Sequence, residues 1–210
     1  ALALDGDTGD LNWYFQFTPH DVHDWDAIQI PVLADLEVDG RVRKVMMWAN
    51  RNAFFYVIDR ETGEYLSGTP FARQTWAEGL DENGRPIRRP NTFPTPEGVL
   101  VAPDASGGTN WQSPTYSPRT ELFYVMAFDG EAEFYIRDEE YIDGERFTGG
   151  GQQRMLPIDN YTSAVRAIDP RTGNRRWEYQ VQPQTWSGLL STAGDIVFGG
   201  TVDGYFYALD

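Results

Sequence analysis

The chain has 210 residues, enough for one sizeable domain, and its 7 Trp, 11 Tyr and 12 Phe can supply a core. A formal net charge of −15 argues against nucleic acid or an anionic membrane as a partner, and an acidic surface suits a basic protein. The absence of cysteine excludes disulfides, thiolate metal sites and a C-x-x-C-H haem attachment within these residues. No apolar run approaches the ~20 residues of a membrane span, and no signal peptide is visible.

A short pattern, Ala-x-Asp-x-x-Thr-Gly-x-x-x-Trp, occurs in full at residues 3–13 and 167–177. A copy without the Trp covers residues 57–64, a fragment lies at 208–210, and residues 127–130 are interpreted as a worn copy. Each copy predicts a hairpin, because Asp and Thr side chains cap a tight turn and Gly supplies a positive φ. The repeat Trp residues, Trp13 and Trp177, are expected to wedge between neighbouring units.

The segments around these turns predict short strands and no long amphipathic helix. The expected strands are Lys44–Trp48, Phe54–Ile58, Leu122–Ala127, Ser163–Ile168, Asp195–Gly199 and Tyr205–Leu209. The 110 residues from Asp59 to Asp169 are expected to hold two units, and the 41 from Asp169 to Asp210 one. Such periods, with four strands each, indicate an all-β fold, a β-propeller of four-stranded antiparallel blades.

The repeat is already under way at residue 1 and restarts at residue 210, so we interpret residues 1–210 as part of a longer propeller domain that supplies about four blades. Between the predicted strands, residues 131–161 are acidic and rich in tyrosine, and they end near three consecutive glycines. This segment is expected to be an insertion. It could cover the mouth of a site, dock an electron acceptor, or form a solvated loop.

One cluster of charge follows the first repeat directly. The seven residues from His20 to Asp26 contain both histidines of the chain and three carboxylates. Such groups are costly to bury unless they pair or bind a metal, so the cluster predicts a site. One alternative is a transition-metal site at His20 and His23, and a metallohydrolase of this kind would need further ligands that the sequence does not show.

The repeat resembles the tryptophan-docking motif of the pyrroloquinoline quinone (PQQ)-dependent alcohol and methanol dehydrogenases. Further matches occur in the order of that family. They are the Thr-Pro-His-Asp-x-x-Asp segment at 18–24, the Asn-Arg-Asn strand start at 50–52, the Gly-Gly-Thr-Asn-Trp loop at 107–111, and Trp-Ser-Gly at 186–188. The resemblance covers essentially all 210 residues and implies roughly the C-terminal half of an eight-bladed enzyme. The family's upstream Glu and Asn metal ligands and its vicinal disulfide are not in this chain.

Asp24 matches the family's catalytic base, which takes the hydroxyl proton of an alcohol, and the family also uses this carboxylate as a metal ligand. Asp26 resembles lanthanide-dependent members, whereas calcium-dependent members usually have a small residue there. One more anionic oxygen suits a trivalent ion, so a lanthanide is expected, with calcium as the alternative. If both carboxylates reach the metal, Trp25 between them must point elsewhere. A turn-capping Asp24 and a solvent-facing Asp26 are the structural alternatives.

The resemblance assigns Arg51 to the quinone oxygens, as a catalytic and cofactor-binding residue that could also pair with Asp24. It assigns Asn110, Trp111 and Trp186 to cofactor binding, with core packing as the alternative for the two tryptophans. Gly107 and Gly108 are expected to let the backbone approach a ligand closely. His23 stands where family members often have Trp, which leaves the choice of substrate open.

The resemblance therefore implies oxidation of a small alcohol to an aldehyde or ketone, with PQQ as the electron acceptor. It further implies a periplasmic protein, a cytochrome c acceptor, and the remaining propeller blades as structural partners. The alternative is a non-catalytic propeller scaffold or binding module with a vestigial site. Such a scaffold would keep the Trp repeat but has no reason to keep Asp24, Arg51 and Asn110 together.

Overall fold

The computed structural model describes residues 1–157, 160–182 and 185–210. These residues contain no α-helix, and hence no helix that could cross a membrane. The strands are β1 Leu2–Leu4, β2 Leu11–Tyr14, β3 Val32–Val38, β4 Arg41–Ala49, β5 Phe54–Asp59, β6 Tyr65–Pro70, β7 Ala77–Leu80, β8 Pro86–Arg88 and β9 Val99–Val101. They continue with β10 Thr115–Ser117, β11 Leu122–Asp129, β12 Ala132–Ile136, β13 Gly151–Met155, β14 Thr162–Ile168, β15 Arg175–Val181, β16 Leu190–Ser191, β17 Val197–Gly200 and β18 Phe206–Leu209. All six strands expected from the sequence are present.

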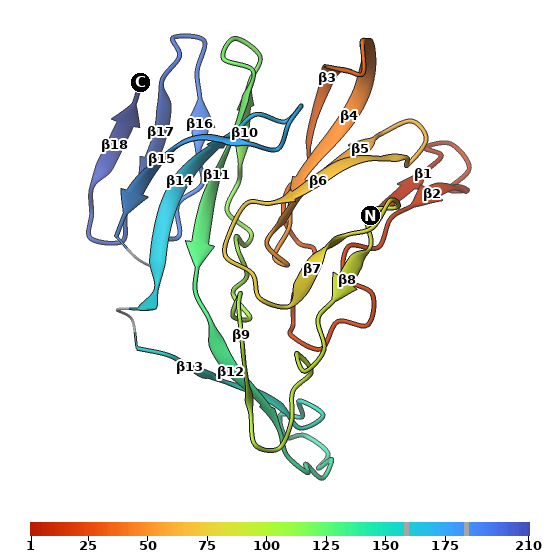
Figure 1. Ribbon diagram of the computed structural model, residues 1–210, viewed down its shortest axis with the longest axis vertical. Coiled ribbons are helices and arrows are strands. Elements are labelled where there is room, and N and C mark those ends of the chain that lie inside the picture. The colour runs from red at the N-terminus through yellow and green to blue at the C-terminus, as the bar shows by residue number, and fades with distance from the viewer. Residues whose placement is uncertain (158–159, 183–184) are drawn as a thin grey trace.

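The sheets occupy four successive positions, which Figure 1 shows from the β1–β2 hairpin on the right to β16–β17–β18 on the left. The two positions between them are complete four-stranded antiparallel sheets, β3–β4–β5–β6 and β10–β11–β14–β15. Two small sheets, β7–β8 and β13–β12–β9, lie outside this series. The arrangement is that of a partial β-propeller with four-stranded antiparallel blades, as the sequence predicted.

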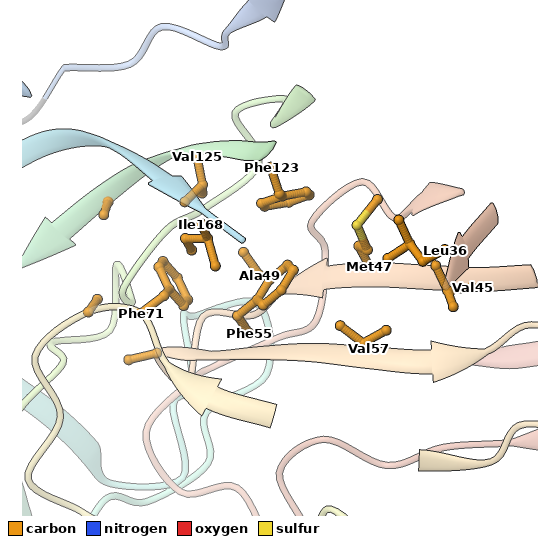
Figure 2. Close-up of a cluster of buried hydrophobic side chains, with 13 residues drawn as sticks. Leu36, Val45, Met47, Ala49, Phe55, Val57, Phe71, Phe123, Val125 and Ile168 are labelled. Carbon is orange, nitrogen blue, oxygen red and sulfur yellow. The ribbon is translucent and has the colours of Figure 1, made fainter. Parts of the chain in front are cut away.

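The central strands of the complete sheets are buried on both faces. In β4, Val45, Met47 and Ala49 point to one core, while Met46 and Trp48 point to another. Strand β11 alternates in the same way between the first core and a third. Figure 2 shows the first core, where side chains of the two complete sheets meet face to face. Successive side chains of a strand point to opposite faces of its sheet, so alternate residues pack against different neighbouring sheets. This alternation allows the sheets to stack.

The Asp-x-x-Thr-Gly turns have the capping that the sequence predicts. In the turn after β5, the Asp59 carboxylate accepts the backbone N–H groups of Glu61 at 2.9 Å and Thr62 at 3.0 Å. The Thr62 hydroxyl oxygen accepts the N–H of Glu64 at 3.2 Å, and Gly63 has φ +77°. The same Thr contact at 3.2 Å and a glycine φ of +71° to +78° recur in the turns at residues 5–10 and 169–174.

Trp13 joins the first hairpin to the next sheet. Its indole N–H donates to the carbonyl oxygen of Arg60 at 3.1 Å, and its ring covers Gly63 in the turn after β5. Trp177 lies in the core between β10–β11–β14–β15 and β16–β17–β18, 5.6 Å from the Tyr124 ring. Both tryptophans thus lie between neighbouring sheets, as expected.

The expectation of two units between Asp59 and Asp169 is wrong. This stretch runs from the β5–β6 turn of one four-stranded sheet to the β14–β15 turn of the next, which is one unit, and its additional residues form β7–β8 and the β13–β12–β9 sheet. The worn copy at residues 127–130 is not a docking turn either. Asp129 instead accepts the N–H of Arg73 at 2.6 Å and pairs with the buried Arg166. Burial raises the Asp129 pKa, but the bonds from Arg166 outweigh burial and hold that pKa below its ordinary value.

The region from 131 to 161 lies between β11 and β14, which pair directly with each other. Within it, β12 pairs with both β13 and β9. The β12–β13 connection projects at the bottom of Figure 1 and exposes Tyr141 and Phe147. Residues 158 and 159 of the expected insertion lie outside the described residues.

The Trp13 contact predicts a specific cost for a methyl group at Gly63. A Cβ atom there would lie 2.8 Å from two ring carbons of Trp13, so the indole must move. Gly40 is the matched control, because its φ is +73° and no heavy atom lies within 4 Å of its Cβ position. Both Gly→Ala variants incur the positive-φ strain, but we expect Gly63→Ala to lower the unfolding free energy by about 1–3 kcal/mol more. Denaturant unfolding measures the difference, and equal losses would contradict the docking contact.

Candidate active site

The loop between β2 and β3 presents two carboxylates on the same side. The side chains of Asp24 and Asp26 are 74% and 65% exposed. Trp25 between them is 1% exposed and packs in the second core. The predicted alternation is therefore present, and it leaves both carboxylates directed away from the core.

Arg51 brings these two carboxylates together. It follows β4 and is 8% exposed. Its Nη2 lies 3.9 Å from Asp24 Oδ2, and its Nη1 lies 4.0 Å from Asp26 Oδ2. The expected pairing with Asp24 is thus present at long ion-pair distance, and Asp26 shares the same guanidinium. Because a guanidinium keeps its charge, it holds two like charges near each other at neutral pH.

Other contacts fix the position of Arg51. Its Nη2 donates to the carbonyl oxygen of Ala105, and its backbone N–H donates to Gln29 Oε1 at 3.3 Å. The same Gln29 oxygen lies 3.5 Å from the indole nitrogen of Trp48. The Arg51 Nε atom is buried and has no partner among the described residues. One donor of this cation is therefore free for a further polar group.

The glycines at 107 and 108 let their loop approach the backbone around Arg51 and Ala53 closely. A Cβ atom at Gly107 would lie 2.7 Å from the Arg51 Cβ and carbonyl oxygen, and one at Gly108 would lie 2.9 Å from Ala53. The Gly108 N–H donates to the Arg51 carbonyl at 2.9 Å. The close approach is thus to the backbone around Arg51, within the protein itself. It attaches the 105–111 loop to the site.

That loop carries Asn110 and Trp111. The Asn110 amide donates to the Ser106 carbonyl at 2.8 Å and accepts the Trp111 N–H at 2.9 Å, so the loop already uses one donor and one acceptor of this side chain. Trp111 is 54% exposed and stacks on Trp186, which is 51% exposed, with ring centroids 6.3 Å apart and planes 20° apart. Core packing therefore does not explain this pair of tryptophans.

The two histidines do not form a common site. His20 is exposed, and its ring lies 5.9 Å from Phe93. His23 is buried, stacks on Trp25 at 4.3 Å, and its Nε2 lies 2.9 Å from the Thr92 carbonyl oxygen. Burial, followed by the nearby Arg88 charge, lowers the His23 pKa to about 4, so its ring is neutral at physiological pH. The described residues contain no group of three or more His, Asp or Glu side chains that could enclose a metal.

Sequence reasoning missed Asp104, a buried carboxylate on which the Arg51 charge acts. Asp104 is fully buried, its carboxylate accepts the Ser106 N–H at 2.7 Å, and its carbonyl accepts the Trp25 indole N–H at 2.9 Å. Its second carboxylate oxygen has no partner among the described residues. Burial raises the Asp104 pKa, against the opposing effects of the backbone N–H groups and the Arg51 charge. No sequence pattern marked this carboxylate, because only the fold buries it and brings the Arg51 charge close enough to act on it.

An open pocket of about 420 Å³ has Asp26, but not Asp24 or Arg51, in its wall. Its wall is formed by the end of β2, the residues that follow it, and the loop that bears Asp21, Trp25 and Asp26. Two converging carboxylates suit a hard cation, and a fixed guanidinium beside them suits the oxygens of an anionic or carbonyl ligand. The exposed pair of Trp111 and Trp186 offers a flat aromatic surface on which a planar ligand could stack.

The model of the PQQ family, described as the β-propeller domain of glucose, ethanol and alcohol dehydrogenases, matches residues 1–71. A quinoprotein ethanol dehydrogenase of Pseudomonas aeruginosa is 36% identical over 220 positions, which cover 100% of this chain and 35% of that protein. A lanthanide-dependent methanol dehydrogenase of Methylacidiphilum fumariolicum is 35% identical over 214 positions, covering 97% of this chain and 34% of that protein. The chain belongs to the quinoprotein alcohol dehydrogenase family.

Solved structures of quinoproteins agree with this assignment. A europium-containing methanol dehydrogenase superposes with a TM-score of 0.91 at 33% identity, over 100% of this chain and 37% of that one. The chain therefore spans about a third of the length of the quinoproteins that it matches. Two carboxylates and one arginine are correspondingly only part of what a quinoprotein site contains.

The residues present fit the two groups that quinoproteins use. Asp24 and Asp26 offer hard oxygen donors, each within 4.0 Å of the same guanidinium, so both carboxylates lie in one region of the site. The buried, unpartnered Arg51 Nε is a donor available to an oxygen-rich quinone. The buried Thr109 hydroxyl, also without a partner, is a further polar group on the 105–111 loop.

The raised pKa of Asp104 predicts how stability depends on pH. The folded protein retains this proton to a higher pH than the unfolded chain, so Asp104 reduces stability progressively as the pH rises above the ordinary value near 3.8. We expect the thermal midpoint of Asp104→Asn, relative to wild type, to be higher at pH 7 than at pH 4. Asp39→Asn, in an exposed turn, is the control. A difference that does not change with pH would contradict the assignment.

Proposed function

We propose that the protein containing this chain oxidises a small alcohol to an aldehyde or ketone, with PQQ as electron acceptor and a lanthanide ion, or alternatively calcium, at Asp24 and Asp26. The observation that carries the proposal is the convergence of Asp24 and Asp26 on the buried Arg51, from separate elements of the fold. Family membership supports the reaction class. When bound, the quinone takes up the two electrons, and the cation acts on it as a Lewis acid.

Asp24 is proposed as the general base. Its carboxylate is exposed and lies 3.9 Å from the Arg51 guanidinium, and a carboxylate within hydrogen-bond reach of an alcohol can accept its hydroxyl proton. The backbone at this residue has φ +64°. Its side chain points to solvent, whereas the side chains of the neighbouring His23 and Trp25 are buried. The proton therefore passes from the alcohol oxygen to an Asp24 carboxylate oxygen.

Arg51 orients the quinone oxygens and balances the charge of the two carboxylates, since its planar fork presents several donors from a fixed position. Asn110 orders the loop that carries Trp111, and the remaining amide N–H of Asn110 can reach a cofactor oxygen. The stacked Trp111 and Trp186 form an aromatic wall for the flat cofactor. Asp26 supplies the additional anionic ligand that favours a trivalent ion.

We further propose a periplasmic location and a cytochrome c as the acceptor of the electrons. A reduced quinone needs an electron acceptor, and the net charge of −15 of these 210 residues suits a basic redox partner. The remaining blades of the full-length protein would supply the rest of the metal and cofactor ligands. A non-catalytic scaffold is the competing outcome of the tests below.

The reaction is tested with the purified full-length protein, supplied with PQQ and either La³⁺ or Ca²⁺, by following dye reduction with short alcohols. We expect turnover, and a loss of about 10²–10⁴-fold in kcat for Asp24→Asn, because the amide cannot accept the proton. Asp39→Asn, in the β3–β4 turn, controls for the same chemical change. No turnover with either ion would overturn the dehydrogenase proposal in favour of the scaffold.

The choice of metal is tested at Asp26. We expect Asp26→Ala to weaken lanthanide binding on the order of tenfold or more, and calcium binding less, because it removes an anionic oxygen. Terbium luminescence measures the lanthanide affinity, and competition by La³⁺ and Ca²⁺ measures the preference. Equal effects on the two ions, or a wild-type protein that Ca²⁺ activates and La³⁺ does not, would contradict the lanthanide proposal.

A further inference from the structure

The backbone at Asp24 has a positive φ, which is uncommon for residues other than glycine. Its φ is +64°, in the left-handed region, and His20 in the same loop has φ +52°. Residues other than glycine are rare in this region, and such a conformation persists only where surrounding contacts determine it. Some feature of the loop must therefore hold Asp24 in place.

The carboxylate of Asp21 bonds to the chain on both sides of Asp24. One oxygen accepts the N–H of His23 at 2.8 Å, and the other accepts the N–H of Trp25 at 2.6 Å. The two oxygens of a single side chain thus bridge the residue before Asp24 and the residue after it. Hydrogen bonds to an ionised carboxylate are stronger than those between neutral groups.

The two residues that Asp21 bridges are themselves fixed by their side chains. The His23 ring contacts the Thr92 carbonyl at 2.9 Å, and the Trp25 indole donates to the Asp104 carbonyl at 2.9 Å. Both side chains are 1% exposed. With its neighbours held at backbone and side chain, Asp24 is left to point outward, toward Arg51.

Strand β8 also contacts the loop that bears Asp24. Arg88, in β8, donates through Nη2 to the His20 carbonyl at 3.3 Å, and its guanidinium lies 5.2 Å from the Trp76 ring and 4.6 Å from the Phe93 ring. Burial lowers the Arg88 pKa, and the Asp21 charge opposes that effect. Arg88 thus holds the backbone at the start of the loop that bears Asp24.

We propose that Asp21 is a positioning residue, whose carboxylate bridges the N–H groups of His23 and Trp25 and thereby holds Asp24 in the left-handed conformation that directs its carboxylate to the reacting alcohol and the metal. This inference rests on the proposed function, because it concerns the same base and the same metal ligand. Asp21 itself need not touch substrate, cofactor or metal to act in this way.

The test is Asp21→Asn in the full-length protein. The amide keeps the size of the side chain, but its NH₂ group cannot accept a hydrogen bond, so one of the two bridging bonds is lost. We expect a loss of about 10–100-fold in kcat at saturating PQQ and metal, a similar loss of terbium affinity, and a KM for alcohol within about threefold of wild type. If Asp21 only stabilised the fold, we would not expect kcat per folded, loaded enzyme to fall while KM stays unchanged.

Asp81→Asn is the matched control. Asp81 also accepts two backbone N–H bonds, from Asn83 at 2.9 Å and Arg85 at 2.8 Å, in a turn between β7 and β8. Hydrogen–deuterium exchange read by mass spectrometry supplies a measurement that needs no activity. We expect faster exchange in residues 20–27 of Asp21→Asn only, whereas loss of a negative charge alone would leave that exchange unchanged.

The outcomes separate the two proposals. If wild type turns over alcohol but Asp21→Asn keeps its kcat and terbium affinity within twofold of Asp81→Asn, Asp21 is not a positioning residue. If wild type shows no turnover, the proposed function fails. The Asp21 bridge is then tested by hydrogen–deuterium exchange of residues 20–27 and by terbium affinity in Asp21→Asn. If both measurements equal those of wild type, the proposed bridge is wrong.

Discussion

Burial of the central strands on both faces is the constraint on which the rest of this structure depends. Strands β4 and β11 send alternate residues into different cores, so each complete sheet is packed between two neighbours. Close packing on both faces fixes the position and orientation of each sheet relative to the next. It therefore also fixes the ends of the loops that connect its strands, including the segment that begins with Arg51. The Trp13 contact with the next turn adds a local link of the same kind.

The candidate site depends on this stacking because its parts come from different places in the chain. Asp24 and Asp26 lie in the loop after the first hairpin, Arg51 follows β4, and the 105–111 loop reaches Arg51 from the connection to β10. Gly107 and Gly108 allow that approach, since any Cβ there would collide with the backbone around Arg51 and Ala53. A single guanidinium therefore links three segments, and its position is set by backbone contacts rather than by the carboxylates alone.

The accessory strands contribute more to the site than the sequence suggested. Thr92, between β8 and β9, holds the ring of His23, and Arg88 of β8 holds the backbone of His20. The loop that bears Asp24 is thus packed against residues that do not belong to the stacked sheets. Histidines that first suggested metal ligands act as part of this packing, because a buried neutral imidazole can stack on Trp25 and bond to a carbonyl.

From the sequence alone we could predict six of the strands, the capped turns of the repeat, the place of Trp13 and Trp177 between sheets, and the family. This was possible because these features depend on local alternation, on turn chemistry and on spacing within a few residues. The tertiary structure was needed to show that residues 59–169 span a single unit with two small sheets beside it, that Asp104 is fully buried, and that Asp21 bridges the residues around Asp24. These depend on contacts across the fold and on backbone φ, and neither leaves a periodic trace in the sequence.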